Sequence, residues 1–403
     1  MKILHISYSD GIGGAAIATT RLHKAFLKNG IKSELWCVKK ISDQEFVKTI
    51  NHKFLEKLNS LKNLVNQSIL RLFGIRNFKS LSLNIWHSGL AKKINKTSFD
   101  IIILHWINAE TISSKELIKI NKPVIWVFHD LWPISGITHY PFNITSFENK
   151  PSFFERKIDK LFYNYKKEIW KNFTPHIVTV SSWLKNVVQE EGFFSNSKIN
   201  IIHNTLDLNI FKPVDYSDFR KSIDPADNKK IVLFGAPNLS VKRKGGDLLI
   251  NSLKEIPNSL RNDIIILTFG MGKINIKGFN CIHLGETNNT LFLAKLYNIS
   301  DVMCVPSRQE TFGQTAVEAQ ACGTPVVAFN ASGLIDVINH KETGYLAKPY
   351  DVKDYSLGIQ MLLENGRDMY SDKCRSLVLK RFNEDKIVEK FINIINLKLN
   401  QMK

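Results

Sequence analysis

The chain has 403 residues, 44% of them hydrophobic and 23% charged, proportions that fit a folded globular protein and exclude a disordered, collagenous or disulfide-dense one. At roughly 150 residues per domain, this length predicts two or three domains, each with its own core. Lys and Arg number 55 against 37 Asp and Glu, and the net charge of +18 predicts an anionic partner.

The chain opens with a predicted strand, loop and helix. An apolar run over residues 2–7 predicts a buried strand, and a helical pattern covers residues 15–28. Gly13 and Gly14 in the loop between them would let backbone approach a ligand closely. Such a loop is common in nucleotide-binding sheets, but the dinucleotide-binding spacing is absent, which disfavours a nicotinamide dehydrogenase.

The positive charge is concentrated in the first half. Residues 1–200 hold 29 basic and 15 acidic side chains, a net +14, whereas residues 201–403 have a net +4. Nine basic residues face one acidic residue between positions 53 and 96: Lys53, Lys57, Lys62, Arg71, Arg76, Lys79, Lys92, Lys93 and Lys96. Leucines interleave at helical spacing, so this region is typical of a basic amphipathic element on an anionic membrane. A solvated helix face in a Lys-rich chain would give the same pattern.

The rest of the first half alternates strands and helices. Further strands are predicted at residues 33–38, 100–106, 123–128, 176–180 and 200–203. This alternation predicts a parallel sheet with helices on both faces. His129 and Asp130 directly follow one of these strands, at the edge where open sheets bind ligands. A histidine there can equally be structural.

The pattern restarts after a polar stretch near residues 206–227. Strands are predicted at residues 231–234, 264–269, 281–284, 302–305 and 326–329. We therefore expect an α/β domain over residues 1–205 and another over 206–383. The segment 384–403 is expected to be a terminal helix that packs back on the first domain. Two open sheets in tandem predict a ligand site in a cleft between them.

Two segments of the second domain carry groups suited to a diphosphate. Lys242, Arg243 and Lys244 follow a strand and precede two glycines, so their charges could surround a leaving diphosphate. A solvated basic turn is the alternative. Later, a helix is predicted to begin near Gly313, where backbone N–H groups can bind phosphate.

Two carboxylates flank that helix start. Glu310 precedes it and Glu318 lies inside it, with a side chain that leans back toward the N-terminus. Carboxylates accept hydrogen bonds from sugar diols. From the spacing alone, a solvated Glu318 and a Glu310 favoured by the helix dipole fit equally well.

The segment from Ser307 to Val327 resembles the Glu-x7-Glu signature of retaining GT-B glycosyltransferases of family 4, also called group 1. The resemblance implies two Rossmann-like domains, with Glu310 on the donor sugar and Glu318 on the nucleotide ribose. It also implies a diphosphate contact by the backbone of four consecutive residues: Phe312, Gly313, Gln314 and Thr315.

The resemblance extends to the other segments. Lys244 and Gly245 match a Lys-Gly pair that contacts the diphosphate, whereas Ala236 stands where the family usually has Arg, which leaves Arg243 as a substitute. The segment around His129 and Asp130 is similar to the His-Asp segment of the colanic-acid type branch, in which the histidine lies near the donor sugar and the acceptor. Gly13 and Gly14 correspond to a loop near the diphosphate and acceptor.

The sequence thus predicts a retaining glycosyltransferase that moves a sugar from a UDP- or GDP-sugar, UDP favoured, to a glycan or a polyprenyl-diphosphate-linked acceptor in bacterial surface glycan biosynthesis. His129, Glu310 and Lys244 are the expected catalytic residues. No Asp-x-Asp triplet occurs, so we expect no metal or other cofactor. A nucleotide-sugar epimerase, a hydrolase and a nucleic-acid-binding protein are the alternatives. The last lacks an aromatic and basic recognition signature.

The five cysteines show no metal-ligand spacing. We find no signal-peptide core and no apolar run of about 20 residues that could span a bilayer. We therefore expect a cytoplasmic protein, held peripherally at the inner face of the cytoplasmic membrane.

Overall fold

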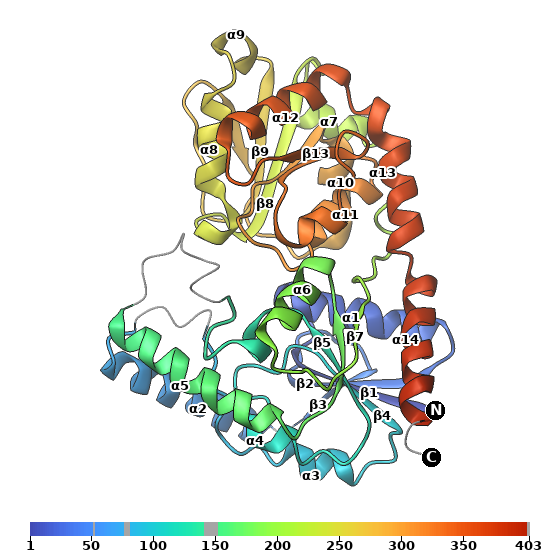
Figure 1. Cartoon of the computed structure of the whole chain (residues 1–403). Coiled ribbons are helices and arrows are strands. Elements are labelled where there is room, and N and C mark those ends of the chain that lie inside the picture. Colours follow the sequence, from blue (N-terminus) through green and yellow to red (C-terminus); the bar gives the residue numbers. More distant parts are fainter. Residues whose placement is uncertain (51–52, 76–80, 141–151, 401–403) are drawn as a thin grey trace. The chain divides into compact units, whose positions relative to one another are not determined.

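The computed structural model describes residues 1–50, 53–75, 81–140 and 152–400, with backbone alone for 53–58. The chain forms two compact units (Figure 1). Unit 1 comprises Met1–Thr205 and Glu384–Lys403, and unit 2 comprises Leu206–Asn383. The chain therefore passes from one unit to the other twice.

Unit 1 is built on a seven-stranded sheet with the order β3-β2-β1-β4-β5-β6-β7. Every neighbouring pair of strands in it is parallel. The strands are β1 (Lys2–Ser9), β2 (Lys32–Lys39), β3 (Val47–Thr49), β4 (Ile101–Leu104), β5 (Val124–Phe128), β6 (His176–Thr179) and β7 (Ile199–Ile201). Both β4 and β5 are buried along their whole length, as expected for apolar runs in a sheet covered on both faces.

Helices cover this sheet (Figure 1). They are α1 (Gly13–Lys28), α2 (Lys53–Leu72), α3 (Leu90–Asn95), α4 (Ser114–Leu117), α5 (Phe153–Trp170), α6 (Ser182–Glu191) and α14 (Glu384–Asn400), with a 3-10 turn, η1, at Trp132–Ile134. A capping box of Ser152 and Glu155 begins α5. The predicted basic region therefore contains α2 and α3. Arg76, Lys79 and the side chains of Lys53 and Lys57 lie outside the described residues.

Unit 2 repeats the architecture with a six-stranded parallel sheet of order β10-β9-β8-β11-β12-β13. Its strands are β8 (Lys230–Asn238), β9 (Ile264–Met271), β10 (Asn280–His283), β11 (Val302–Val305), β12 (Val326–Phe329) and β13 (Gly344–Ala347). Its helices are α7 (Ser217–Ile223), α8 (Gly246–Lys254), α9 (Asn258–Arg261), α10 (Thr290–Ile299), α11 (Gln314–Ala321), α12 (Val352–Asn365) and α13 (Asp368–Arg381), with 3-10 turns η2 (Lys242–Lys244) and η3 (Ser332–Asp336). The predicted α/β fold of two parallel sheets is confirmed.

Each sheet contains one place where the strand order reverses direction along the chain. In unit 1 the chain builds β1 to β3 toward one edge and then returns to place β4 on the other side of β1. In unit 2 the equivalent neighbours are β8 and β11. Loops diverge at such positions, so the carboxyl ends of these strand pairs are where open sheets bind ligands.

The terminal helix α14 packs on α1 within unit 1. The rings of Phe391 and Phe26 meet edge to face, with their centroids 5.9 Å apart. Lys28 pairs with Glu384, and the Asn29 side-chain amide donates to the Asp385 carboxylate at 3.1 Å. The apolar face of α14 therefore completes the core of unit 1, although 178 residues of unit 2 separate it from the rest of that unit in the sequence.

The five cysteines are all free thiols. Among the described residues, no helix combines the length and the apolar character needed to cross a membrane.

We expect Phe391→Ala to lower the free energy of unfolding of unit 1 by about 3 kcal/mol, because it leaves a cavity under α14. Leu397→Ala on the same helix is the control: Leu397 is 57% exposed, so its removal should change stability by no more than about 0.5 kcal/mol. All seven tryptophans lie in unit 1, so urea unfolding followed by tryptophan fluorescence reports this unit alone. Equal midpoints for the two variants would contradict the packing role of α14.

Candidate active site

Two loops meet at the carboxyl ends of β8 and β11 in unit 2. The first contains η2 and leads into α8, and the second runs from Pro306 to Gly313 and leads into α11. Gly245, with φ +74°, lies against the second loop so closely that a Cβ atom there would be 1.8 Å from the Pro306 carbonyl oxygen. Glycine is therefore required for this approach.

An ion pair joins the two loops. Lys244 Nζ lies 2.5 Å from Glu310 Oε1, and Ser307 Oγ donates to the same oxygen at 2.9 Å. Arg243 Nη1 is 3.8 Å from Glu310 Oε2 and donates to the Gln309 carbonyl at 2.7 Å. Lys244, Arg243 and Glu310, predicted from separate motifs, thus form one cluster.

Burial and charge act in opposite directions in this cluster. Burial alone would raise the pKa of the Glu310 carboxyl, but Lys244, Arg243 and the Ser307 hydroxyl outweigh it and hold that pKa below its usual value. Burial lowers the pKa of Lys244, an effect that Glu310 opposes and Arg243 reinforces. The cluster therefore holds a carboxylate that is ionised at neutral pH beside two cations.

A second ion pair fixes the backbone around the cluster. Arg308 binds both carboxylate oxygens of Asp247 at 2.7 and 2.6 Å, and its backbone N–H donates to the Arg243 carbonyl at 2.8 Å. Bidentate pairs of this kind fix geometry as well as adding energy. Arg308 was not identified as a site residue from the sequence, because nothing in its spacing indicates a partner 61 residues away.

The start of α11 is clamped by η3. Gly313 has a φ of +101°, and the Gly333 backbone N–H donates to the Glu310 carbonyl at 2.8 Å. The Ser332 hydroxyl accepts the Glu310 N–H at 2.9 Å. The N-terminal turn of α11, with Gln314 and Thr315, therefore has a fixed place beside the Glu310 loop, and the positive end of its dipole favours an anion there.

Glu318 and Phe312 have buried side chains. Tyr297 of α10 donates its hydroxyl to Glu318 Oε2 at 2.8 Å, and Glu318 is only 5% exposed. The Phe312 ring packs edge to face on Phe382, with the centroids 5.4 Å apart. Any ligand contact by Phe312 would thus come from its backbone, as the resemblance implies.

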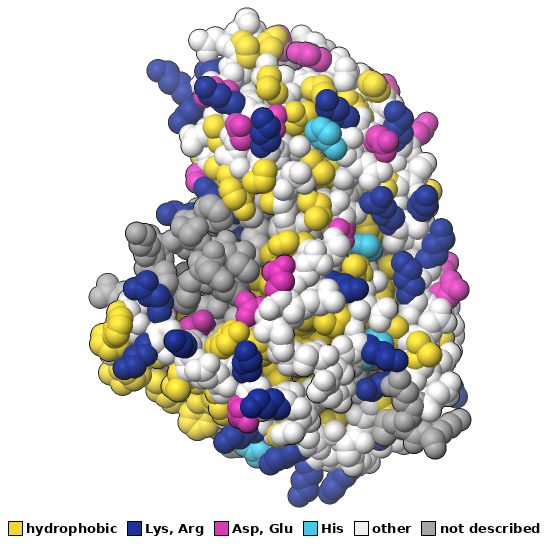
Figure 2. All heavy atoms as spheres, viewed as in Figure 1, with side chains coloured by type: hydrophobic (Ala, Val, Ile, Leu, Met, Phe, Trp, Pro, Cys, Tyr) yellow, Lys and Arg dark blue, Asp and Glu magenta, His cyan; other side chains and the backbone are white. Residues whose placement is uncertain are grey.

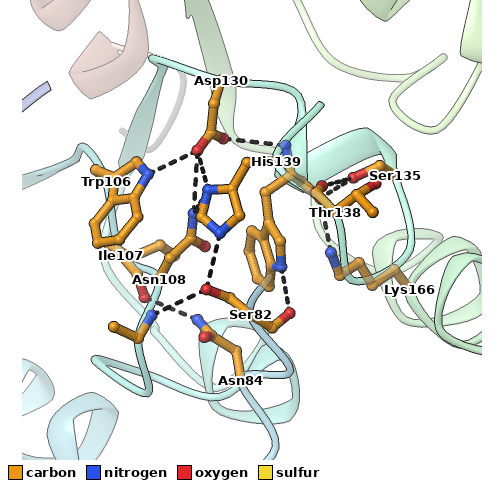
Figure 3. A network of polar contacts seen from close by, with 12 residues as sticks. Ser82, Asn84, Trp106, Ile107, Asn108, Asp130, Ser135, Thr138, His139 and Lys166 are labelled. Carbon is orange, nitrogen blue, oxygen red and sulfur yellow. Dashed lines mark hydrogen bonds and ion pairs between the residues drawn. The ribbon is translucent and has the colours of Figure 1, made fainter. Parts of the chain in front are cut away.

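In unit 1, Asp130 is the centre of a buried polar network (Figure 3). Trp106, Asn108 and His139 all point toward its carboxylate. Oδ2 accepts from Trp106 Nε1 at 2.6 Å and lies 2.7 Å from His139 Nδ1, while Oδ1 accepts the Trp132 N–H at 3.0 Å. The carboxylate is thus held by the protein itself and fixes the backbone that follows β5.

The same network reaches the loop before α3. His139 Nε2 lies 2.9 Å from the Ser82 hydroxyl, and Trp132 donates its indole N–H to the Ser82 carbonyl at 2.8 Å (Figure 3). The fully buried Lys166 of α5 donates to the Trp132 carbonyl at 2.7 Å. Burial lowers the pKa of this lysine far below its usual range, an effect that nearby Asp159 partly offsets.

His129 lies at the end of β5, partly exposed. Its ring nitrogen Nε2 is 3.2 Å from Nδ1 of His105, which follows the neighbouring strand β4. Burial lowers the pKa of His129 to about 4, although Asp130 acts in the opposite direction. His129 is therefore a neutral imidazole at physiological pH.

The Gly-rich loop after β1 is held by Asp10. The Asp10 carboxylate accepts from the backbone N–H groups of Ile41 and Ser42 at 2.7 and 3.0 Å. Gly13, with φ +81°, begins α1, and no atom lies within 4 Å of the position that its Cβ would take. Gly13 and Gly14 thus open α1 at the carboxyl end of β1, in unit 1, whereas the ion-pair cluster belongs to unit 2.

Among the described residues, no group of three or more His, Cys, Asp or Glu side chains is arranged to hold a metal ion.

Comparison with known families accounts for both units. Residues 12–210 match the glycosyltransferase family 4 domain, and residues 215–377 match the domain described as glycosyl transferases group 1. The chain belongs to this glycosyltransferase family. Both matched domains are glycosyltransferase domains, which favours sugar transfer over the epimerase and hydrolase alternatives.

Two curated relatives illustrate the similarity. An uncharacterized glycosyltransferase of Methanocaldococcus jannaschii is 27% identical over 241 residues, which are 56% of this chain and 61% of the relative. A D-inositol 3-phosphate glycosyltransferase of a Mycobacterium species is 31% identical over 184 residues, 42% of this chain and 40% of that protein. The matches thus span about three fifths and two fifths of the lengths of these relatives.

Among solved structures, HepE of Anabaena in complex with UDP and glucose has the same fold. The match has a TM-score of 0.68 and 17% identity, and it covers 98% of this chain and 99% of HepE. The glycosyltransferase thus has the GT-B fold predicted from its sequence.

We expect Gly245→Ala to destabilise unit 2 of the glycosyltransferase by more than the roughly 1–2 kcal/mol that a left-handed conformation costs alanine, because the new methyl group would clash with Pro306. Gly192→Ala in unit 1 is the matched control: its φ of +68° and ψ of +11° are also left-handed helical and no atom lies within 4 Å of the Cβ position, so only the conformational cost applies. Urea unfolding followed by circular dichroism measures both. Equal losses would show that the two loops do not pack as described.

Proposed function

We propose that this glycosyltransferase moves a hexose or related sugar from a nucleoside diphosphate sugar, preferably a UDP-sugar, to a lipid-linked or polysaccharide acceptor in bacterial surface glycan synthesis. The observation that carries the proposal is the cluster of Lys244, Arg243 and Glu310 beside the start of α11. The complex of HepE with UDP and glucose supports a uridine donor. The resemblance to the colanic-acid type branch supports the acceptor class.

Each member of the cluster has a role in this proposal. The diphosphate would lie among Lys244, Arg243 and the N-terminal turn of α11, which offset the negative charge that grows on it as the glycosyl bond breaks. Glu310 also provides the counter-charge for Lys244, which keeps the lysine in place. Glu310 would accept hydrogen bonds from hydroxyls of the donor sugar and Glu318 from those of the ribose.

The reaction would proceed with retention by attack on the front face of the sugar. The bond between the anomeric carbon and the phosphate oxygen breaks, and the acceptor oxygen bonds to that carbon on the same face. The acceptor proton passes to the leaving phosphate oxygen, so no enzymic nucleophile takes part. The cations and the helix terminus supply the charge stabilisation, so the proposal involves no metal ion.

We also propose that unit 1 docks peripherally on the anionic inner face of the cytoplasmic membrane, where a lipid-linked acceptor would lie. The docking face is the α2–α5 surface, the solvent-facing sides of these two helices. They share one apolar cluster, which contains Leu70 of α2 and has Ile158 and Phe162 of α5 packed against it. Hydrophobic side chains gather over this part of unit 1, with Lys and Arg beside them (Figure 2).

The α2–α5 surface carries both apolar and basic groups. Its exposed apolar side chains are Leu61, Leu64, Val65, Ile69 and Leu72 on α2, and Phe153, Phe154 and Leu161 on α5. Exposed basic residues on the same helices are Arg71, Arg156, Lys157, Lys160 and Lys167. Insertion of apolar side chains together with attraction to anionic headgroups is the usual basis of interfacial binding. Lys62 and Lys93 donate to carbonyl groups of the chain, so they contribute less to this surface than the sequence predicts.

We expect Lys244→Ala, Glu310→Ala and Glu318→Ala each to reduce transfer from a UDP-sugar by about 100-fold or more, the loss typical when one preorganised electrostatic contact is removed. The melting temperature of the wild-type protein should rise as the UDP concentration is increased, and Lys244→Ala should abolish that rise. Lys254→Ala, on an exposed position at the end of α8, is the control and should keep both properties. Wild-type transfer in all three site variants would overturn the assignment.

We expect the triple variant Arg156→Gln, Lys157→Gln and Lys160→Gln to bind vesicles of equal parts phosphatidylcholine and phosphatidylserine about 100-fold more weakly, since each cation near the surface contributes roughly 1 kcal/mol. The matched control neutralises three exposed lysines of unit 2, Lys353, Lys373 and Lys380. Co-sedimentation with the vesicles measures binding. Equal partitioning of the two triple variants would reject docking through the α2–α5 surface.

A further inference from the structure

Three histidines lie in a row across adjacent strands of unit 1. His5 is in β1, His105 follows β4 and His129 follows β5, so the row crosses the β1/β4 position where the strand order reverses. His5 Nδ1 is 3.0 Å from His105 Nε2, and His105 Nδ1 is 3.2 Å from His129 Nε2. The ring planes differ by only 16° and 27°, and the centroids lie 5.3 and 5.5 Å apart, the separation of rings that meet edge to edge through these nitrogens. Each contact therefore lies close to both ring planes, as a hydrogen bond between imidazoles requires.

The three rings are neutral. His5 is fully buried and His105 is 2% exposed, and burial lowers the pKa of both well below the usual value. Burial also lowers the pKa of His129 to about 4. A neutral imidazole has one N–H donor and one bare nitrogen. Each of the two contacts needs one N–H donor and one bare nitrogen. The ring protons must therefore all point the same way along the row.

The buried end of the row decides which way they point. His5 Nε2 has no hydrogen-bond partner among the described residues. Its surroundings are the rings of Phe26 and His23, and His23 itself contacts the Ser33 hydroxyl through Nδ1 at 2.9 Å. Protons pointing toward this end would leave a buried N–H without an acceptor, whereas the opposite direction leaves only a bare lone pair. An unsatisfied buried N–H is the rarer case in proteins.

We propose that the row His5–His105–His129 fixes His129 in the tautomer that carries its proton on Nδ1, so that His129 presents an N–H and no basic nitrogen beyond the row. His5 Nδ1–H donates to His105, and His105 Nδ1–H donates to His129 Nε2. His105 and His5 are thus positioning residues that act through His129. The part of this inference that concerns substrate rests on the proposed glycosyl transfer.

The tautomer restricts what His129 can do. With Nε2 occupied as an acceptor and Nδ1 protonated, a neutral His129 has no bare nitrogen with which to remove a proton. To act as a base at Nδ1, it would need all three ring protons to shift along the row, which would place an unsatisfied N–H in the core beside Phe26. This agrees with a reaction in which the acceptor proton goes to the leaving phosphate oxygen.

The tautomer can be measured directly in the wild-type chain. Long-range proton–nitrogen correlation spectra of protein with 15N-labelled histidine distinguish protonated from bare ring nitrogens, and His129→Gln assigns the His129 signals. We expect protonated Nδ1 and bare Nε2 on His5, His105 and His129. A protonated Nε2 on His129 would overturn the proposal, and this measurement requires no substrate.

Two variants of His105 with side chains of similar size test whether His105 controls the tautomer of His129. His105→Asn places an amide N–H near the position of the imidazole Nδ1 and can still donate to His129, whereas His105→Leu has similar size and no donor. Both variants lose the contact to His5 equally. We expect His129 to stay protonated on Nδ1 in His105→Asn and to shift toward protonated Nε2 in His105→Leu.

The kinetic expectation follows the tautomer. His105→Leu should lower kcat/KM for transfer about tenfold relative to His105→Asn, because the oriented N–H at Nδ1 of His129 is replaced by a bare nitrogen. UDP-induced thermal stabilisation, which reports the donor site in unit 2, should be the same in both variants. Identical His129 tautomers in the two variants would overturn the proposal. If the tautomers are as expected but the wild-type protein shows neither stabilisation by UDP nor transfer, the proposed function is rejected and the proposal for the histidine row still holds.

Discussion

The geometry of parallel sheets determines where this protein can carry out chemistry. In each unit the strand order reverses once, at β1/β4 and at β8/β11, and loops leave the carboxyl ends of these strands in opposite directions. Two polar clusters lie at these positions. In unit 2 the Lys244–Glu310 pair links the loops that follow β8 and β11, and in unit 1 the contact between His5 and His105 links β1 to the end of β4. Buried apolar strands on either side hold both clusters rigid.

The two clusters solve the problem of buried polarity differently. In unit 2 the groups are charged, and each charge has a partner: Glu310 is held ionised by Lys244 and Arg243, and Arg308 by Asp247. In unit 1 the histidines are neutral, because burial removes their charge. A charged cluster suits a diphosphate that gains negative charge, whereas a neutral row suits the orientation of a single hydrogen bond. The division of roles between donor binding and hydroxyl recognition in our proposal follows from this difference.

Much of this arrangement could be predicted from local sequence. The strands at residues 302–305 and 326–329 and the start of α11 were predicted within about a residue, because continuous apolar runs and a glycine mark them clearly. The edge strands β3 and β13 were missed, since neither is buried along its whole length as β11 and β12 are. Ser307, Ser332 and Tyr297, which hold the two glutamates, also escaped prediction. Their partners are decided by loop packing, for which no spacing rule exists.

The sequence by itself determined the fold class, the family and the residue types of the Lys244–Glu310 cluster, because hydrophobic periodicity and the Glu-x7-Glu motif are local properties of the chain. Only the tertiary structure decided which of these residues act together. Residues 66 positions apart form the Lys244–Glu310 pair, and residues 100 apart form the contact between His5 and His105. Asp130 provides the clearest contrast. Its position directly after a strand predicted a ligand contact, whereas in the structure protein hydrogen-bond donors surround its buried carboxylate. Such contacts depend on strand order, which determines which distant residues become neighbours.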